Sequence, residues 1–209
     1  MRPTVIMKAA MTLDGQLAAA DGTSQWISSP EARRDAHRLR ATVDAVMVGA
    51  GTVRADDPRL TVRLDAGSGS DTEQPIPVIV AGKGGLPSGA RLFRRDPVVL
   101  SPTELELPGQ IVAPDETGDR VDLAAGIASL GTLGIQRLLV EGGSRLFRSL
   151  LEADLIDRAV FYYGPMLGGG VGAPLFSGRW STLADARVVR AAGAGHRLGE
   201  SIRLDVDFP

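Results

Sequence analysis

Two short glycine-containing segments have the composition of a phosphate-binding turn. The first, Val140-Glu141-Gly142-Gly143-Ser144, comes where a short apolar run ends and a helical pattern begins. Glycine at such a point lets the backbone approach a ligand closely, and the first N–H groups of the following helix can bind a phosphate. A tight strand-to-helix turn that needs positive φ explains the same residues equally well. The segment therefore indicates a dinucleotide or phosphate site, with a plain turn as the alternative.

The second segment, Val48-Gly49-Ala50-Gly51-Thr52, is a glycine turn at the end of another predicted strand. It is not the dinucleotide fingerprint of Rossmann domains, because Arg54 stands where the third glycine would be and no acidic ribose ligand follows at the usual distance. Gly82-Lys83-Gly84 is not a Walker A loop, since no Ser or Thr follows the lysine. Two strand-end glycine turns still indicate a ligand crevice at the carboxyl ends of the strands.

Several charged or aromatic residues could act at such a crevice, although each also has a plainer explanation. Lys8 lies inside the first predicted strand, where burying an ammonium is costly unless it is paired or lines a cleft; on an edge strand it would simply face solvent. Arg40 and Arg63 are either solvated charges or bidentate phosphate ligands. Asp56 is expected in a turn with the proline two residues later. Trp26 is most simply a buried side chain, and otherwise a surface that stacks on a planar ring.

The elements that must position these residues alternate between strands and helices. Ser29 is expected to cap a helix whose first residue is Pro30 and which ends near Ala41. Alternation predicts an α/β fold with a mostly parallel sheet, and a C-terminal hairpin of 186–190 with 201–206 should close one edge and make the sheet mixed. The other predicted strands are 4–10, 45–48, 78–81, 98–100, 138–140 and 159–163, and the other predicted helices are 123–133 and 144–153.

Composition narrows the classes of function. The chain has 209 residues, of which 44% are hydrophobic and 23% charged, as in an ordinary globular protein. Its formal net charge of −2 offers no basic surplus for nucleic acid or an anionic membrane surface. The absence of cysteine excludes disulfides, thiolate nucleophiles and thiolate metal sites, and it fits a reducing cytoplasm. With only His37 and His196 as imidazoles, a histidine-rich metal site is not expected; a carboxylate site for magnesium stays open, although nothing in the sequence indicates one.

The organisation of the chain is expected to be simple. Lys8 and Asp14 interrupt the N-terminal apolar residues, so these do not form a signal peptide, and no apolar run is long enough to span a bilayer. A soluble, cytoplasmic protein is the expectation. Polar, glycine-rich segments at 66–74 and 83–89 are predicted surface loops, and a single domain over 1–209 is favoured.

Five motifs, taken together, are highly specific. In order and spacing they resemble the pyrimidine reductases of riboflavin biosynthesis, the reductase half of the bifunctional deaminase–reductase family, over nearly the whole chain. The motifs are Lys8-Ala9-Ala10-Met11-Thr12-Leu13-Asp14-Gly15, Ser24-Gln25-Trp26-Ile27-Ser28-Ser29, the run from Gly51-Thr52-Val53-Arg54 to Leu60-Thr61-Val62-Arg63, Val140-Glu141-Gly142-Gly143-Ser144 and Phe161-Tyr162-Tyr163-Gly164-Pro165-Met166-Leu167-Gly168-Gly169.

The resemblance implies a fold similar to dihydrofolate reductase, a mixed sheet flanked by helices, assembled as a homodimer. It implies an NADPH-dependent oxidoreductase that reduces the ribosyl group of 5-amino-6-(5-phosphoribosylamino)uracil, a phosphorylated pyrimidine, to a ribityl chain. No zinc deaminase precedes the reductase in this chain, and the lack of cysteine excludes the Pro-Cys-x-x-Cys signature of that enzyme. A separate deaminase is therefore expected in the pathway.

The resemblance also assigns site residues. A further cofactor contact falls after the predicted strand 78–81, where this chain has Gly82 and lacks the hydroxyl residue that the family often places there. For the proton movement that opening of the ribose requires, Lys8 and Asp56 remain equal candidates. The implied cofactor-binding residues are Ala10, Trp26, Thr52, Asp56, Gly82, Gly143, Ser144, Arg145 and Leu146; the implied substrate-binding residues are Lys8, Ser24, Arg40, Leu60, Arg63 and Glu141; and the implied catalytic residues are Lys8, Asp56 and Glu141.

Two other functions stay open. A sister reductase could act on a related pyrimidine, pterin or other N-riboside, but it would have less need of two arginines placed for a sugar phosphate. A non-catalytic NADPH- or pyrimidine-binding module would keep the glycine turns while losing the charged substrate residues, and this chain has both sets. Turnover distinguishes the last alternative from the first two.

Overall fold

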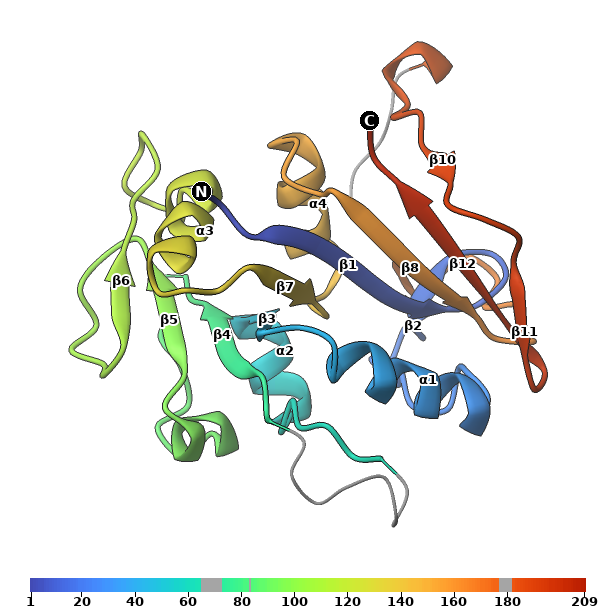
Figure 1. Cartoon of the computed structure of the whole chain (residues 1–209), viewed down its shortest axis with the longest axis horizontal. Coiled ribbons are helices and arrows are strands. Elements are labelled where there is room, and N and C mark those ends of the chain that lie inside the picture. The colour runs from blue at the N-terminus through green and yellow to red at the C-terminus, as the bar shows by residue number, and fades with distance from the viewer. Residues whose placement is uncertain (65–72, 83, 177–181) are drawn as a thin grey trace. The chain divides into compact units, whose positions relative to one another are not determined.

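The computed structural model describes residues 1–64, 73–82, 84–176 and 182–209, which form two compact units (Figure 1). The first unit contains Met1–Val5 and His37–Gly143, and the second contains Ile6–Ala36 and Ser144–Pro209. Lys83 and most of the predicted 66–74 loop lie outside the described residues. The single domain expected from the sequence stays a prediction.

The first unit is built on five parallel strands. Their spatial order is β7 (Arg137–Val140), β3 (Ala45–Gly49), β4 (Ile76–Val80), β5 (Val98–Ser101) and β6 (Gln110–Val112). Residues 45–48 of β3 are at most 1% exposed, because this strand has neighbours on both sides and other elements over its faces. The buried strands predicted from their unbroken apolar runs are confirmed, and β6 is an additional strand that the sequence did not reveal.

Two helices and a 3₁₀ turn complete this unit. Helix α3 (Leu123–Thr132) is capped by the Asp122 carboxylate, which accepts a hydrogen bond from the Ala125 N–H at 3.0 Å. Gly126 brings α3 close to β5, because a Cβ atom at this position would lie 3.0 Å from Leu100 Cδ1. Helix α2 (Ala50–Asp56) begins directly at the glycine turn after β3, where the sequence indicated a turn alone; η1 spans Arg91–Arg95.

The second unit holds a mixed sheet. Strand β1 (Thr4–Met11), whose first residues belong to the first unit, runs parallel to β8 (Arg158–Tyr163), and β12 (Ser201–Asp207) pairs antiparallel with β8. A separate two-stranded ribbon joins β2 (Gln16–Ala18) to β9 (Ala173–Pro174). The predicted α/β class with a mixed, mostly parallel sheet flanked by helices is therefore confirmed.

The helices of this unit begin where the sequence predicted. Ser29 caps α1 (Pro30–Arg40), since its hydroxyl accepts a hydrogen bond from the Ala32 N–H at 3.1 Å. Helix α4 (Ser144–Glu152) buries Phe147 and Leu150, and a short 3₁₀ turn, η2, spans Leu183–Asp185.

The C-terminal hairpin differs from its prediction. Residues 186–189 are not strand, and β10 is only Arg190–Ala191, paired antiparallel with the end of β12. The tight hairpin instead joins β11 (His196–Leu198) to β12 through Gly199, whose φ of +62° is readily adopted by glycine. The edge of the sheet is thus antiparallel as expected, but the residues that form the hairpin with β12 lie closer to the C-terminus than predicted.

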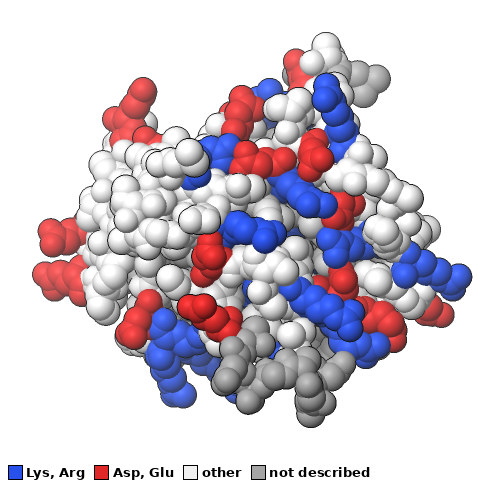
Figure 2. All heavy atoms as spheres, in the orientation of Figure 1, with Lys and Arg blue, Asp and Glu red and all other residues white. Residues whose placement is uncertain are grey.

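Charged side chains of both signs are mixed over the face shown in Figure 2, as expected for 23 basic and 25 acidic residues. Among the residues that the structure describes, no helix is long and apolar enough to cross a membrane. The same residues contain no group of three or more His, Asp or Glu side chains that could hold a metal ion.

The Asp14 carboxylate joins two loops of the second unit. It accepts hydrogen bonds from the Thr12 hydroxyl at 2.6 Å and from the N–H groups of Gly168 and Gly169, both at 2.8 Å. These bonds, the one from Gly168 first, lower the pKa of Asp14 from 3.8 to about 2. Leu13 and Asp14 form a turn after β1, and the Asp14 carboxylate fixes the loop that follows β8.

Replacing this carboxylate should make the protein less stable in a pH-dependent way. Because the pKa of Asp14 is lower in the folded protein than its ordinary 3.8, its contribution is complete above about pH 4 and disappears as pH falls through about 2. We expect Asp14→Asn to lower the melting temperature at pH 7, and the difference from the parent protein to shrink as pH falls toward 2. Circular dichroism melts would measure it, with the exposed Glu116→Gln as control; a constant difference across this range would contradict the assignment.

Candidate functional site

Three neighbouring strands of the first unit end at the same edge. The strands β7, β3 and β4 are parallel neighbours, so their carboxyl ends meet there, and the Glu141 N–H ties the end of β7 to the Met47 carbonyl at 2.9 Å. A Cβ atom added at Gly51 or Gly82 would meet nothing within 4 Å, and one added at Gly143 would reach only Thr52 Oγ1, at 4.0 Å. This edge therefore presents accessible backbone, and it brings together two predicted cofactor residues, Thr52 and Gly143.

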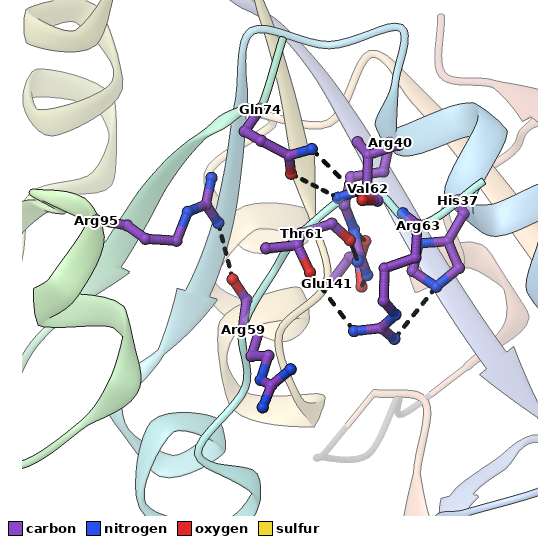
Figure 3. A network of polar contacts seen from close by, with 9 residues as sticks. All are labelled: His37, Arg40, Arg59, Thr61, Val62, Arg63, Gln74, Arg95 and Glu141. Atoms are coloured by element: carbon purple, nitrogen blue, oxygen red, sulfur yellow. Dashed lines mark hydrogen bonds and ion pairs between the residues drawn. The ribbon is translucent and has the colours of Figure 1, made fainter. Parts of the chain in front are cut away.

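A mostly buried ion pair lies beside this edge (Figure 3). The guanidinium of Arg40, in the last turn of α1, donates through Nε and Nη2 to the two carboxylate oxygens of Glu141 at 2.9 and 2.8 Å, and through Nη1 to the Thr61 carbonyl at 2.5 Å. The two side chains are 11% and 12% exposed. Three of the guanidinium's five N–H groups are therefore bound, and the pair fixes Glu141 at the end of β7.

Side chains hold the chain from Arg59 to Val62 in place beside this cluster. Arg95 donates to the carbonyls of Arg59 at 2.8 Å and Pro75 at 2.7 Å, and Gln74 accepts from the Val62 N–H at 2.8 Å (Figure 3). Leu60, a predicted substrate contact, is 5% exposed with φ +50°, so only its backbone can face a ligand.

Arg63 follows this segment and is exposed. Its backbone N–H donates to His37 Nδ1 at 3.2 Å, and its Nη2 lies 3.2 Å from His37 Nε2. Desolvation, followed by the neighbouring cations of Arg40 and Arg59, lowers the pKa of Arg63 below its ordinary value. The Glu141 carboxylate acts in the opposite direction on this pKa, so cations and a carboxylate meet in this cluster.

The two consecutive aspartates at the end of α2 have different environments. Asp57 adopts a left-handed conformation, and its carboxylate accepts from the Arg91 N–H at 2.8 Å and pairs with Arg91 Nε at 3.1 Å. Asp56 is exposed, and within the described ranges no hydrogen bond or ion pair holds its carboxylate. Asp57 is thus the structural aspartate of the predicted turn.

In the second unit, Lys8 and Ala10 point to the same face of β1. Lys8 is half-buried, with Nζ 5.7 Å from the centre of the Tyr162 ring, so its interpretation as a solvent-facing lysine is wrong. The Tyr162 hydroxyl donates to Asp35 at 2.8 Å, and Arg203 pairs with the same carboxylate at 2.8 Å. Burial, together with Asp35, raises the pKa of Tyr162, which keeps the phenol protonated beneath the lysine.

Ser24 and Trp26 lie in the exposed loop before α1. Trp26 is 68% exposed, and the Arg33 guanidinium lies 4.3 Å from the centre of its ring. The expectation that Trp26 is buried is wrong, since the indole lies in this loop beside Arg33 and not in the core. An exposed indole leaves the stacking interpretation open.

The three predicted cofactor residues at the start of α4 differ in the environment of their side chains. The Ser144 hydroxyl donates to the Pro174 carbonyl of β9, which anchors the start of the helix. Arg145 is exposed, whereas Leu146 is 7% exposed and lies in the core, so any ligand contact by Leu146 uses its backbone.

Sequence reasoning missed two features of the site. It read Arg40 as a phosphate ligand without foreseeing that Glu141, 101 residues away, accepts its hydrogen bonds. It also gave no role to His37, although His37 lies one helical turn before Arg40 and therefore on the same face of α1, a spacing that is visible in the sequence.

A mixed, mostly parallel sheet with flanking helices and glycine turns at its strand ends defines an α/β protein with the usual ligand-binding edge. The chain belongs to the RibD C-terminal domain family, whose model matches residues 3–192.

Individual relatives agree with that assignment. The chain is 41% identical over 215 residues to the 2,5-diamino-6-ribosylamino-4(3H)-pyrimidinone 5′-phosphate reductase of Methanothermobacter thermautotrophicus, covering 99% of this chain and 92% of that protein. It is 41% identical over 168 residues to the riboflavin biosynthesis protein RibD of Mycobacterium tuberculosis, covering 80% of this chain and 44% of that protein. The structure of Acinetobacter baumannii RibD matches 100% of this chain and 58% of its own, with a TM-score of 0.88 and 29% identity. The chain thus spans only about half of the RibD relatives.

Breaking the Arg40–Glu141 pair from one side should be costly. We expect Arg40→Met to lower the free energy of unfolding by about 3 kcal/mol, because the Glu141 carboxylate would remain mostly buried without its partner. The double variant Arg40→Met/Glu141→Leu should lose less than the sum of the two single changes. Urea unfolding of all four proteins measures the coupling, and additive losses would contradict the coupling.

The exposed pair of Arg34 and Glu31 on the same helix is a matched control. Its atoms are also 2.9 Å apart, but both side chains are 45% exposed. Solvent screening should keep the effect of Arg34→Ala within about 0.5 kcal/mol.

Proposed function

We propose that this chain is an NADPH-dependent reductase of riboflavin biosynthesis that converts the ribosyl group of 5-amino-6-(5-phosphoribosylamino)uracil to a ribityl chain. The observation that carries the proposal is the joint presence of three open glycine positions at neighbouring strand ends and the Arg40–Glu141–Arg63 cluster beside them. The names of the RibD relatives support the pathway.

A second substrate is favoured by a different observation. The Methanothermobacter relative, 92% of whose length is covered, is named for a 2,5-diamino-6-ribosylamino-4(3H)-pyrimidinone 5′-phosphate. The two compounds share the phosphorylated ribosyl group on an amino nitrogen and differ in the pyrimidine. Reduction of the diaminopyrimidinone would precede deamination in the pathway, whereas reduction of the uracil compound would follow it.

The strand-end edge fits a dinucleotide cofactor. Gly51 and Gly82 leave space where a side chain would stand, and Gly143 faces only the Thr52 hydroxyl, so backbone and hydroxyl groups can approach phosphates directly. Thr52, Asp56, Gly82 and Gly143 are the proposed NADPH contacts at this edge, and the family resemblance adds Ala10, Trp26, Ser144, Arg145 and Leu146. When bound, NADPH supplies the hydride for the reduction.

The chain's own residues bind the substrate and support proton movement. Glu141, held in place by Arg40, offers carboxylate oxygens to N–H donors of the pyrimidine, and Arg63 offers a cation to the phosphate. Ser24 and the Leu60 backbone would add polar contacts. Lys8, whose ammonium lies 5.7 Å from the centre of the Tyr162 ring, and the exposed Asp56 are the two candidates for moving a proton during ring opening of the ribose.

The assay that tests this function measures two products in parallel. Purified protein with NADPH and each of the two phosphoribosyl compounds is followed by loss of the reduced-nicotinamide absorbance and by the mass of the product. A gain of two hydrogens with matching NADPH consumption supports a reductase, and the preferred substrate shows whether deamination comes first. NADPH binding without turnover of either compound would instead favour a non-catalytic module or another N-riboside.

Removing Lys8 should impair turnover more than cofactor binding. We expect Lys8→Ala to lower kcat by about 100-fold, as loss of a proton-transfer group does, with little change in the Kd for NADPH. The loss of kcat in Asp56→Asn, measured in the same assay, shows how much Asp56 contributes to proton transfer. Asp57→Asn is the matched control, because its carboxylate binds Arg91 and its loss should act on thermal stability. Equal losses of turnover and NADPH binding in Lys8→Ala would argue against the role.

Other expectations from the sequence are proposals of the same kind. We propose that the protein is a homodimer in the cytoplasm and that nucleic acid, membrane and metal have no role in its function. A separate deaminase would act on the pathway intermediate either before or after this reductase. The mass of the purified protein in solution, by light scattering, tests the dimer.

A further inference from the structure

One face of the β8–β12 pair in the second unit is apolar and only partly covered. The register pairs Ile202 with Tyr163 and, two residues further along, Leu204 with Phe161. Because side chains alternate between the two faces of a sheet, both pairs and Val206 share one face. Exposure rises along β12 from 4% at Val206 to 48% at Ile202, with Leu204 half-buried between them. The end of this face near Ile202 is therefore open to solvent.

The opposite face of β12 is occupied by contacts within the unit. The Ser201 hydroxyl accepts a hydrogen bond from the Ser29 N–H at 2.9 Å, and Arg203 pairs with Asp35 of α1 at 2.8 Å. Helix α1 and the residue before it thus cover that face. The half-exposed Ile202 belongs to a contiguous apolar surface and is not a lone apolar side chain, and such surfaces commonly bind another protein.

The open end forms a hollow that also carries one charge of each sign. Its volume is about 600 Å³, and its lining is Pro165, Gly195, Arg197, Glu200 and Ile202. Arg197 lies opposite Ile202 in the β11–β12 hairpin, and Glu200 lies in the turn of that hairpin (Figure 1). Both charged residues are exposed. The surface therefore combines apolar side chains with a cation and an anion.

A second copy of this surface has the complementary charges. A two-fold axis makes a surface meet itself, so that two different residues of one copy contact each other's counterparts in the other copy. An axis between Arg197 and Glu200 would bring each arginine beside a glutamate of the other copy and would pack the two apolar ends together. A strongly acidic or strongly basic partner would instead place one of these two charges beside its like.

We propose that this surface is the interface of a homodimer whose two-fold axis passes between Arg197 and Glu200. Its residues are Tyr163, Pro165, Arg197, Glu200, Ile202 and Leu204. The inference rests on the homodimer that the proposed function includes, and it adds the face and the symmetry. It does not depend on the reaction or on the substrate.

A charge placed in the apolar part should separate the two copies. We expect Ile202→Asp to raise the Kd of the dimer at least about 100-fold, because a carboxylate would be buried near its own copy across the axis. Val112→Asp is the matched control: Val112 is 50% exposed on β6 of the first unit, and its change should leave the Kd within about twofold. Sedimentation equilibrium on the full chain measures both, and circular dichroism checks the fold.

Exchange of the two charges tests the symmetry. Arg197→Glu and Glu200→Arg, made singly, should each raise the Kd about tenfold, because like charges would then face each other across the axis. The double variant should return to within about threefold of the parent, since the opposite charges meet again. Arg190→Glu alters the net charge as much as Arg197→Glu does, at the other end of β12, and should leave the Kd within about twofold.

The results separate this inference from the proposed reaction. A monomeric parent protein, or an Ile202→Asp variant that dimerises as tightly as the parent, would overturn the inference, and the second result would leave the homodimer in place through another face. Failure of the double exchange to restore dimerisation would overturn the two-fold arrangement. A parent that dimerises through this surface but reduces neither pyrimidine would contradict the proposed reaction and leave the interface standing.

Discussion

The ion pair of Arg40 and Glu141 organises the ligand-binding part of the first unit. Glu141 follows β7, and a carboxylate at the end of a buried strand needs a partner that replaces its lost hydration. Arg40 donates two charge-assisted hydrogen bonds to Glu141 and a third to the Thr61 carbonyl. One guanidinium therefore joins the end of α1, the end of β7 and the segment that contains Thr61.

Polar networks have a comparable role in the second unit. Asp35 receives the Tyr162 hydroxyl and the Arg203 guanidinium, and the ring of that tyrosine lies beneath the Lys8 ammonium. The lysine is thus positioned by a cation–π contact on a phenol that cannot easily turn, which suits a group whose reach and protonation matter. Asp14 similarly holds the turn after β1 to the loop after β8.

The two candidate substrates differ in the ring and agree in the sugar phosphate. Under the proposed function, a contact of Arg63 with the phosphate would serve either compound, and discrimination would fall to groups that face the pyrimidine, with Glu141 the proposed one. A carboxylate accepts hydrogen bonds from amino and ring N–H groups, which the diaminopyrimidinone has in greater number than the uracil.

The sequence by itself determined the alternation of strands and helices, the Ser29 cap and the glycine turns at strand ends, because hydrophobic spacing and cap chemistry are local properties. The five motifs also determined the family. The sequence did not predict the short elements correctly. Helix α2 follows a segment that was predicted as a glycine turn alone, and the strand of the C-terminal hairpin is 196–198 where 186–190 was predicted. Pairing within the sheet, and not local preference, selects such short strands. Only the tertiary structure decided that Trp26 is exposed, that Lys8 lies over Tyr162, and that Arg40 pairs with Glu141 while His37 faces Arg63. These facts depend on contacts between residues far apart in the chain, and no local pattern encodes which charge will lie beside which.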